Sequence, residues 1–169
     1  DAILWLEQAG LINKVLLSKA PKLPLKAYDD LGTFKLYTLD LGLLRRLSEL
    51  DASILLLPTP AYTEYKGALA ENYILQSLTA QFQMPFRYWA SGNKAEVDFL
   101  LQYANQIYPI EVKADQNIQG KSLIQYEKLF QPTCRIRYSM LNLKRDGNLL
   151  NIPLFLADKT KALLGVVSD

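Results

Sequence analysis

The chain has 169 residues, half of them apolar and 21% charged, with a formal net charge of +2. This composition suits one soluble domain with a small appendage, and no apolar run is long enough to span a membrane. Histidine is absent and Cys134 is the single cysteine, which excludes imidazole chemistry and internal disulfides and predicts a reducing, cytoplasmic location.

Residues 1–60 predict a small α/β appendage. "AILWLEQAG" predicts a helix that ends at Gly10, and Asp40 is placed to cap a second helix, "LGLLRRLSEL". Two strands are expected between these helices, at "LINKVLLSK" and "TFKLYTLD". Prolines in residues 51–60 predict an internal boundary. The chain opens on a helical pattern without an initiator methionine, so we expect it to be a piece of a longer protein.

Residues 61–169 predict an αβββαβ core. A long helix is expected over 61–82, followed by strands at "FRYWAS", "EVDFLLQY" and "IYPIEVKA", of which the last two form an antiparallel hairpin. A helix over 119–130 and a strand at "CRIRYSML" complete a right-handed crossover, which implies a parallel strand pair. The tail predicts a turn at "DGN", a short strand near "LFLA" and a final apolar segment.

Three apolar elements of this core each carry an acid. Glu71 interrupts an apolar helix face, and Asp98 lies inside an apolar strand. Glu111 and Lys113 are two apart on the next strand, so their side chains share a face. A buried charge is costly unless it is paired or bound to something. A structural alternative is an ion pair between Glu111 and Lys113, or between Glu71 and Lys113.

The order of these motifs resembles the PD-(D/E)xK nuclease-like superfamily. "EVDF" and "IEVKA" match its two central motifs, and "GALAENYILQSL" matches the helix that supplies a further acid. The whole chain resembles the uncharacterised C-terminal domain of prokaryotic AAA-type (AAA+) ATPases, domain of unknown function 4143, including "LEQAGLI" and "FKLYTLDLGLLRRL". The resemblance implies a restriction-endonuclease-like core with a mixed sheet, and an N-terminal appendage that is winged-helix-like.

The resemblance also implies a site for Mg²⁺ or Mn²⁺, which take hard oxygen ligands. The carboxylates of Asp98 and Glu111 and the backbone carbonyl of Val112 would bind the metal, with Glu71 as a further ligand or acceptor. Lys113 would orient the attacking water or help to deprotonate it. The expected catalytic residues are therefore Glu71, Asp98, Glu111 and Lys113, and the expected contacts to nucleic-acid phosphates are Arg135, Arg137, Lys144 and Arg145.

One motif resembles a P-loop. "DQNIQGKS" ends in Gly-Lys-Ser between a strand and a helix, but Asp115 occupies the position where a P-loop needs its first glycine. We therefore expect no ATP site in this chain. The resemblance implies that its partner is an upstream AAA-type ATPase module of the same protein. The sequence leaves open metal-dependent nucleic-acid cleavage, a non-catalytic docking module for nucleic acid or protein with a relic nuclease site, and an oligomerisation domain.

Overall fold

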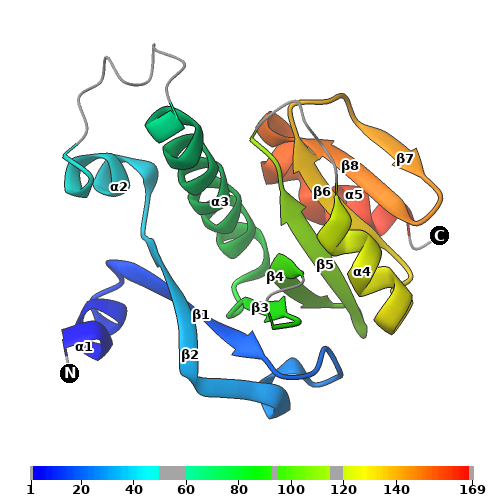
Figure 1. Cartoon of the computed structure of the whole chain (residues 1–169), viewed down its shortest axis with the longest axis horizontal. Coiled ribbons are helices and arrows are strands. Elements are labelled where there is room, and N and C mark those ends of the chain that lie inside the picture. Colours follow the sequence, from blue (N-terminus) through cyan, green and yellow to red (C-terminus); the bar gives the residue numbers. More distant parts are fainter. Residues whose placement is uncertain (1, 50–59, 93–94, 115–119, 168–169) are drawn as a thin grey trace.

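The computed structural model describes residues 2–49, 60–92, 95–114 and 120–167 (Figure 1). Within these residues, eight strands form one mixed sheet in the order β2-β1-β3-β4-β5-β6-β8-β7, accompanied by five α-helices. The helices are α1 (Ala2–Gln8), α2 (Leu41–Leu47), α3 (Pro60–Phe82), α4 (Lys121–Phe130) and α5 (Thr160–Val167). The strands are β1 (Ile12–Ser18), β2 (Asp29–Thr38), β3 (Arg87–Ala90), β4 (Glu96–Tyr103), β5 (Gln106–Val112), β6 (Arg135–Ser139), β7 (Lys144–Asp146) and β8 (Leu149–Pro153). The protein is therefore a mixed α/β structure.

The predicted order of elements in the core is confirmed. It runs α3, β3, β4, β5, α4, β6, and β4 pairs with β5 in an antiparallel hairpin. Ala104 and Asn105 make the hairpin turn, both with positive φ angles, of 48° and 58°. β5 and β6 pair in parallel across α4, with Glu111 opposite Arg137. β5 thus lies in the middle of the sheet, between β4 and β6.

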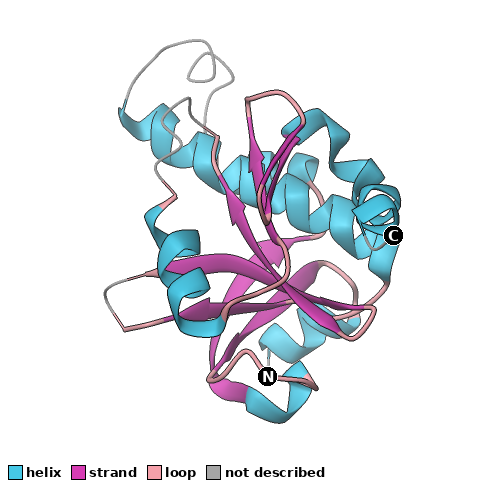
Figure 2. Ribbon diagram, turned by 90° about the vertical axis from the view of Figure 1, so that its right-hand side faces the viewer, coloured by secondary structure: helices cyan, strands magenta, loops and turns pink. Residues whose placement is uncertain are grey.

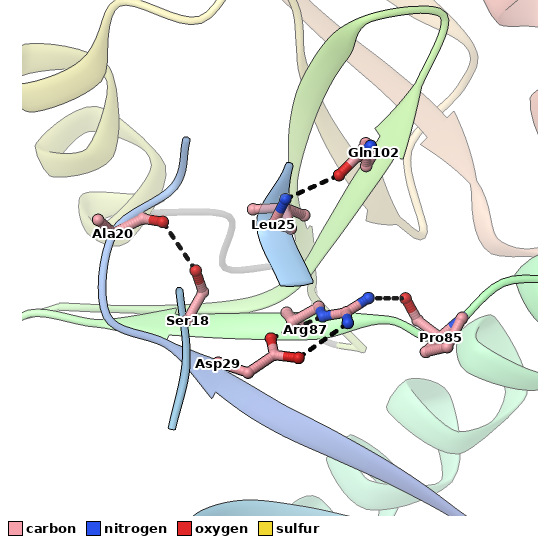
Figure 3. Close-up of polar contacts among 7 residues, drawn as sticks. All are labelled: Ser18, Ala20, Leu25, Asp29, Pro85, Arg87 and Gln102. Atoms are coloured by element: carbon pink, nitrogen blue, oxygen red, sulfur yellow. Dashed lines mark hydrogen bonds and ion pairs between the residues drawn. The ribbon is translucent and has the colours of Figure 1, made fainter. Parts of the chain in front are cut away.

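The two N-terminal strands extend this same sheet. β1 pairs antiparallel with β2 and parallel with β3. An ion pair between Arg87 and Asp29 joins β3 to β2, with Nε to Oδ1 and Nη2 to Oδ2 both at 2.9 Å (Figure 3). Arg87 also donates to the carbonyl of Pro85 at 2.8 Å. The boundary predicted at residues 51–60 lies outside the described residues apart from Pro60, so the two-part division stays a prediction.

Further contacts hold the segment between β1 and β2 against the core (Figure 3). Ser18 Oγ donates to the carbonyl of Ala20 at 2.9 Å, which stabilises the turn out of β1. The backbone N–H of Leu25 donates to the side-chain oxygen of Gln102 on β4 at 2.8 Å. Leu25 is 1% exposed and packs in the core cluster that contains Trp89. β1 and β2 therefore belong to the main sheet.

The helix ends in the N-terminal region agree with the sequence. Gly10 follows α1 with a φ of +71°, a conformation that glycine adopts without strain. Asp40 caps α2, because its Oδ1 accepts the backbone N–H of Leu43 at 2.8 Å. Both predicted ends are confirmed.

The C-terminal strand was predicted a few residues too late. β8 comprises Leu149–Pro153, while Leu154–Lys159 forms a 3₁₀ helix, so the strand predicted near "LFLA" is wrong. Pro153 has no N–H to continue a ladder, and the chain leaves the sheet there. β7 was not predicted, since its residues are all exposed and polar and show no apolar alternation.

The helices α3 and α4 cover opposite faces of the sheet, and Figure 2 shows helices on both sides of it. Ile74, Leu75 and Leu78 of α3 pack in one core cluster with Ile110 and Val112 of β5. Leu123 and Tyr126 of α4 pack in a second cluster, against which Ile107 of β5 lies. Side chains alternate along a strand, so these two clusters define the two faces. No helix among the described residues has the length and apolarity to cross a membrane.

Candidate functional site

Glu111 is a buried acid near the end of β5. It is 2% exposed, and its Oε1 lies 3.2 Å from Nζ of Lys113. Its other carboxylate oxygen, Oε2, is buried and has no hydrogen-bond partner among the residues that the structure describes. Burial raises the pKa of Glu111, while Lys113 and then Arg137 act in the opposite direction. A buried oxygen without a partner is costly, so it indicates a place where a ligand can complete the site.

The carboxylate of Glu111 faces the start of α4. Its neighbours Ile110 and Val112 belong to the core cluster on the α3 side, so Glu111 points to the α4 side. A Cβ atom on Gly120, the residue that precedes α4, would lie 2.8 Å from Glu111 Oε2. Only a glycine permits this approach without displacing the carboxylate, and the start of α4 therefore closes over Glu111.

A β-bulge in β4 places Asp98. Trp89 pairs with Val97 and Arg87 pairs with Leu100, so two steps along β3 face three steps along β4. The side chain of the bulged Asp98 turns toward the end of β5, where its Oδ2 accepts the backbone N–H of Val112 at 2.7 Å. The β4–β5 ladder ends at the pair Phe99 and Ile110, and the N–H of Val112 beyond it is bound by this carboxylate.

The electrostatic surroundings of Asp98 connect it to three other charges. Burial and then the charge of Glu71 raise its pKa to about 7. The N–H of Val112, Lys35 and Lys113 act in the opposite direction. A positive charge bound beside Asp98 would therefore stabilise its ionised form against these two unfavourable effects.

Glu71 lies on α3, next to β2. Its Oε2 accepts the hydroxyl proton of Tyr37 at 2.9 Å. Burial, followed by the charge of Glu71, raises the pKa of Tyr37, so the hydroxyl keeps the proton that it donates. The neighbouring Asn72 also holds β2 against α3, because its Oδ1 accepts a hydrogen bond from the backbone N–H of Thr38 at 2.9 Å. Glu71 is thus paired with a tyrosine instead of the lysine that the structural alternative proposed.

Lys35 and Tyr37 of β2 border the site, and the sequence analysis did not single them out. Both line a pocket of about 460 Å³ between β2, α2 and α3, which also exposes Glu71. Lys35 forms an ion pair with Glu96 at the start of β4. Their spacing of two on a predicted strand was the signal for a shared polar face. Their proximity to Glu71 and Asp98 depends on how β2 lies against α3.

Lys113 connects the two strand carboxylates. It pairs with Glu111 on one side, and its charge lowers the pKa of Asp98 on the other. Oxygen donors of this kind are those that Mg²⁺ and Mn²⁺ bind, and the unpartnered oxygen of Glu111 fits such an ion. Across the described ranges, however, no three Asp, Glu, His or Cys side chains are grouped so that they could hold a metal ion. The metal and the carbonyl of Val112 as its ligand stay predictions.

The four basic residues expected to contact nucleic acid have different surroundings. Arg135 is held by Glu127, with Nη1 to Oε2 at 2.9 Å, and it also donates twice to Asn148. Arg137 donates from Nε to Asn151 at 3.1 Å and is partly exposed. The remaining two, Lys144 and Arg145, are both exposed on β7. Arg135 therefore has a structural role, whereas Arg137 lies beside the site.

Among known proteins, the similarity of this chain lies in its core. No curated protein and no solved structure matches the chain. The model of one family, described as a domain of unknown function (DUF4143), matches residues 66–155, which is more than half of the chain and includes Glu71, Asp98 and Glu111. The chain therefore belongs to the DUF4143 family.

Proposed function

We propose that this chain is a nuclease-like domain that cleaves nucleic-acid phosphodiester bonds with a divalent metal ion. The observation that carries the proposal is the buried Glu111 carboxylate, which has one oxygen paired with Lys113 and one without a partner. A buried polar atom without a partner calls for an explanation, and a bound ion is one. The order α3, β3, β4, β5, α4, β6 supports a restriction-endonuclease-like core.

The residues present can divide the chemistry among them. Asp98 and Glu111 would hold Mg²⁺ or Mn²⁺ at the end of β5, and Glu71 would stabilise the arrangement from α3. A metal bound there supplies charge stabilisation at the phosphate and a more acidic water. Lys113 holds its ammonium group beside Glu111 and would orient the water and the phosphate. The hydrogen bond from Val112 fixes the orientation of Asp98.

The partner that we propose is an AAA-type ATPase module of the same protein, in the cytoplasm. The proposal rests on the resemblance of the sequence to the domain that follows such ATPase modules, and membership of the DUF4143 family supports it. An ATPase would move or remodel the nucleic acid, and this domain would cut it.

The test is a calorimetric titration of Mg²⁺ and Mn²⁺ into the chain and its variants. We expect binding to the wild type, and its loss in Asp98→Asn and in Glu111→Gln. Asp158→Asn is the control, because Asp158 is exposed and pairs with Lys159 away from the site. Binding that Asp98→Asn and Glu111→Gln leave unchanged, or no binding to folded wild type, would overturn the metal site. A cleavage assay with single- and double-stranded DNA and RNA then tests the activity.

A second candidate function is a docking module for nucleic acid or protein that retains a relic of the nuclease site. The burial of Glu111 favours it, as does the lack, in the described part of the chain, of a three-ligand group for a metal. This alternative expects partner binding that survives Asp98→Asn and Glu111→Gln. It also expects that binding to weaken when the exposed Lys144 is changed.

A further inference from the structure

A second pocket lies one strand away from Glu111. It has a volume of about 400 Å³, within the range of small-molecule sites, and is lined by residues of β6, β7 and β8 and of the segment between β6 and β7. These three strands lie together at one end of the sheet (Figure 1). Arg137, Leu143, Lys144, Asp146, Leu149 and Asn151 are among its lining residues. The pocket therefore combines cations, an acid, an amide and leucine side chains.

One row of side chains leads from Glu111 into this pocket. Glu111 of β5 is in register with Arg137 of β6. Arg137 is in register with Asn151 of β8, and Asn151 with Lys144 of β7. Residues in register on neighbouring strands have their side chains on the same face. Arg137 consequently lies between the proposed metal site and the pocket, and Lys144 lies at the far end of the row. The part from Arg137 to Lys144, which carries two positive charges, is called the cationic row.

Asn151 holds the row in place. It is 5% exposed, and its Oδ1 accepts from Arg137 Nε at 3.1 Å and from Ser139 Oγ at 2.8 Å. Its Nδ2 donates to the carbonyl oxygens of Leu141 and Asn142, at 3.3 and 3.0 Å. One buried amide thus fixes both the guanidinium group and the loop that leads to β7, which is the arrangement of a preformed site.

A second row of side chains lines the other end of the pocket, where the chemistry is different. Asp146 of β7 is in register with Leu149 of β8, two residues along each strand from the cationic row. Leu149 offers an apolar surface, and the carboxylate of Asp146 can accept hydrogen bonds but repels anions. The two ends of the pocket therefore suit different parts of one ligand.

We propose that this pocket binds one nucleotide of the nucleic-acid substrate. The phosphate lies at Arg137 and Lys144, and the base lies against Leu149 with an exocyclic amino group donating to Asp146. Arginine and lysine bind phosphate, and a carboxylate recognises the amino group of cytosine. The inference rests on the proposed function only in placing the next phosphate along the strand beside Glu111.

The test is a titration of small probes into the protein. Binding is monitored through the NMR signals of the side-chain amide of Asn151 and of the methyl groups of Leu149. EDTA excludes metal throughout. The probes are cytidine 5′-monophosphate, uridine 5′-monophosphate, cytidine and inorganic phosphate. We expect cytidine 5′-monophosphate to shift both sets of signals and to bind more tightly than the other three.

Two lysine variants distinguish binding in the pocket from a general effect of positive charge. Lys144→Ala should weaken the binding of cytidine 5′-monophosphate by about twofold to fivefold, as expected for an exposed ion pair. Lys159→Ala removes the same charge from an exposed lysine that pairs with Asp158 and does not line the pocket, and should leave binding unchanged. Asp146→Asn should remove the preference for cytidine over uridine monophosphate.

Three results would overturn the inference. The first is equal weakening by Lys144→Ala and Lys159→Ala. The second is binding of inorganic phosphate as tight as that of the nucleotide, and the third is a set of NMR shifts that does not include Asn151 and Leu149. Because the titrations contain no metal, their failure is distinct from a failure of the metal titration. Asp98→Asn should lose the metal and keep the nucleotide.

Discussion

Two buried ion pairs in this protein show how a structural acid differs from a candidate functional one. Asp29 gives both carboxylate oxygens to Arg87, which also donates to Pro85 (Figure 3). Glu111 gives one oxygen to Lys113 and leaves the other without a partner. The Asp29 side chain is 9% exposed and that of Glu111 is 2% exposed, so burial does not distinguish them. The distinction lies in whether the hydrogen-bonding capacity is used.

The largest expected effect comes from breaking the satisfied pair. Arg87→Met leaves Asp29 buried and unpaired, which should lower the free energy of unfolding by about 3–5 kcal/mol. Urea unfolding followed by circular dichroism measures it. The double variant Asp29→Leu with Arg87→Met removes both charges and should recover most of the loss. A single variant as stable as wild type would mean that this pair is not structural.

Asp98 provides a pH-dependent comparison. Its folded pKa is raised from 3.8 to about 7, so the folded state binds more protons than the unfolded state between these values. Stability should therefore fall as the pH rises through this range. Asp98→Asn does not titrate, and its advantage over wild type should grow by about 1–3 kcal/mol between about pH 4 and pH 8.

Unfolding curves of both proteins at several pH values, without metal, measure this difference. Asp158→Asn, an exposed acid outside the site, should run parallel to wild type. A constant difference between Asp98→Asn and wild type across the range would contradict the raised pKa.

Gly120→Ala tests the close contact at Glu111. The new Cβ would lie 2.8 Å from Oε2, and the buried carboxylate has little room to turn, so we expect a loss of about 1–2 kcal/mol. Gly67→Ala in α3 is the matched control, because its Cβ would meet nothing within 4 Å. That change should be neutral or stabilising by about 0.5–1 kcal/mol. Thermal unfolding compares the two, and equal outcomes would show that Gly120 is not constrained.

The smallest effect on stability is expected at Glu111 itself. Burial raises the pKa of this carboxylate, so Glu111→Gln removes a charge that the fold holds at a cost. We expect stability at neutral pH to be unchanged or higher by up to about 1 kcal/mol, together with the loss of cation binding. Asp29→Asn, by contrast, should destabilise. If Glu111→Gln destabilises as strongly as Asp29→Asn, Glu111 is a structural acid.

The sequence predicted local features well where consecutive residues decide them. The antiparallel hairpin of β4 and β5 and the parallel pair of β5 and β6 follow from alternation and from the helix between the strands. The bulge at Asp98 was not visible, because it depends on how β4 pairs with β3. β7 was missed since it buries no side chain and so has no apolar pattern.

The sequence alone determined the order of the elements, the presence of one acid in each of three apolar segments, and the resemblance to a family. These properties belong to short stretches of chain. Only the tertiary structure decided that Tyr37 donates to Glu71, 34 residues away, and that α4 begins against Glu111. It also aligned Glu111, Arg137, Asn151 and Lys144 in one row. The partner of a buried side chain is set by packing between distant segments, and no local periodicity encodes that contact.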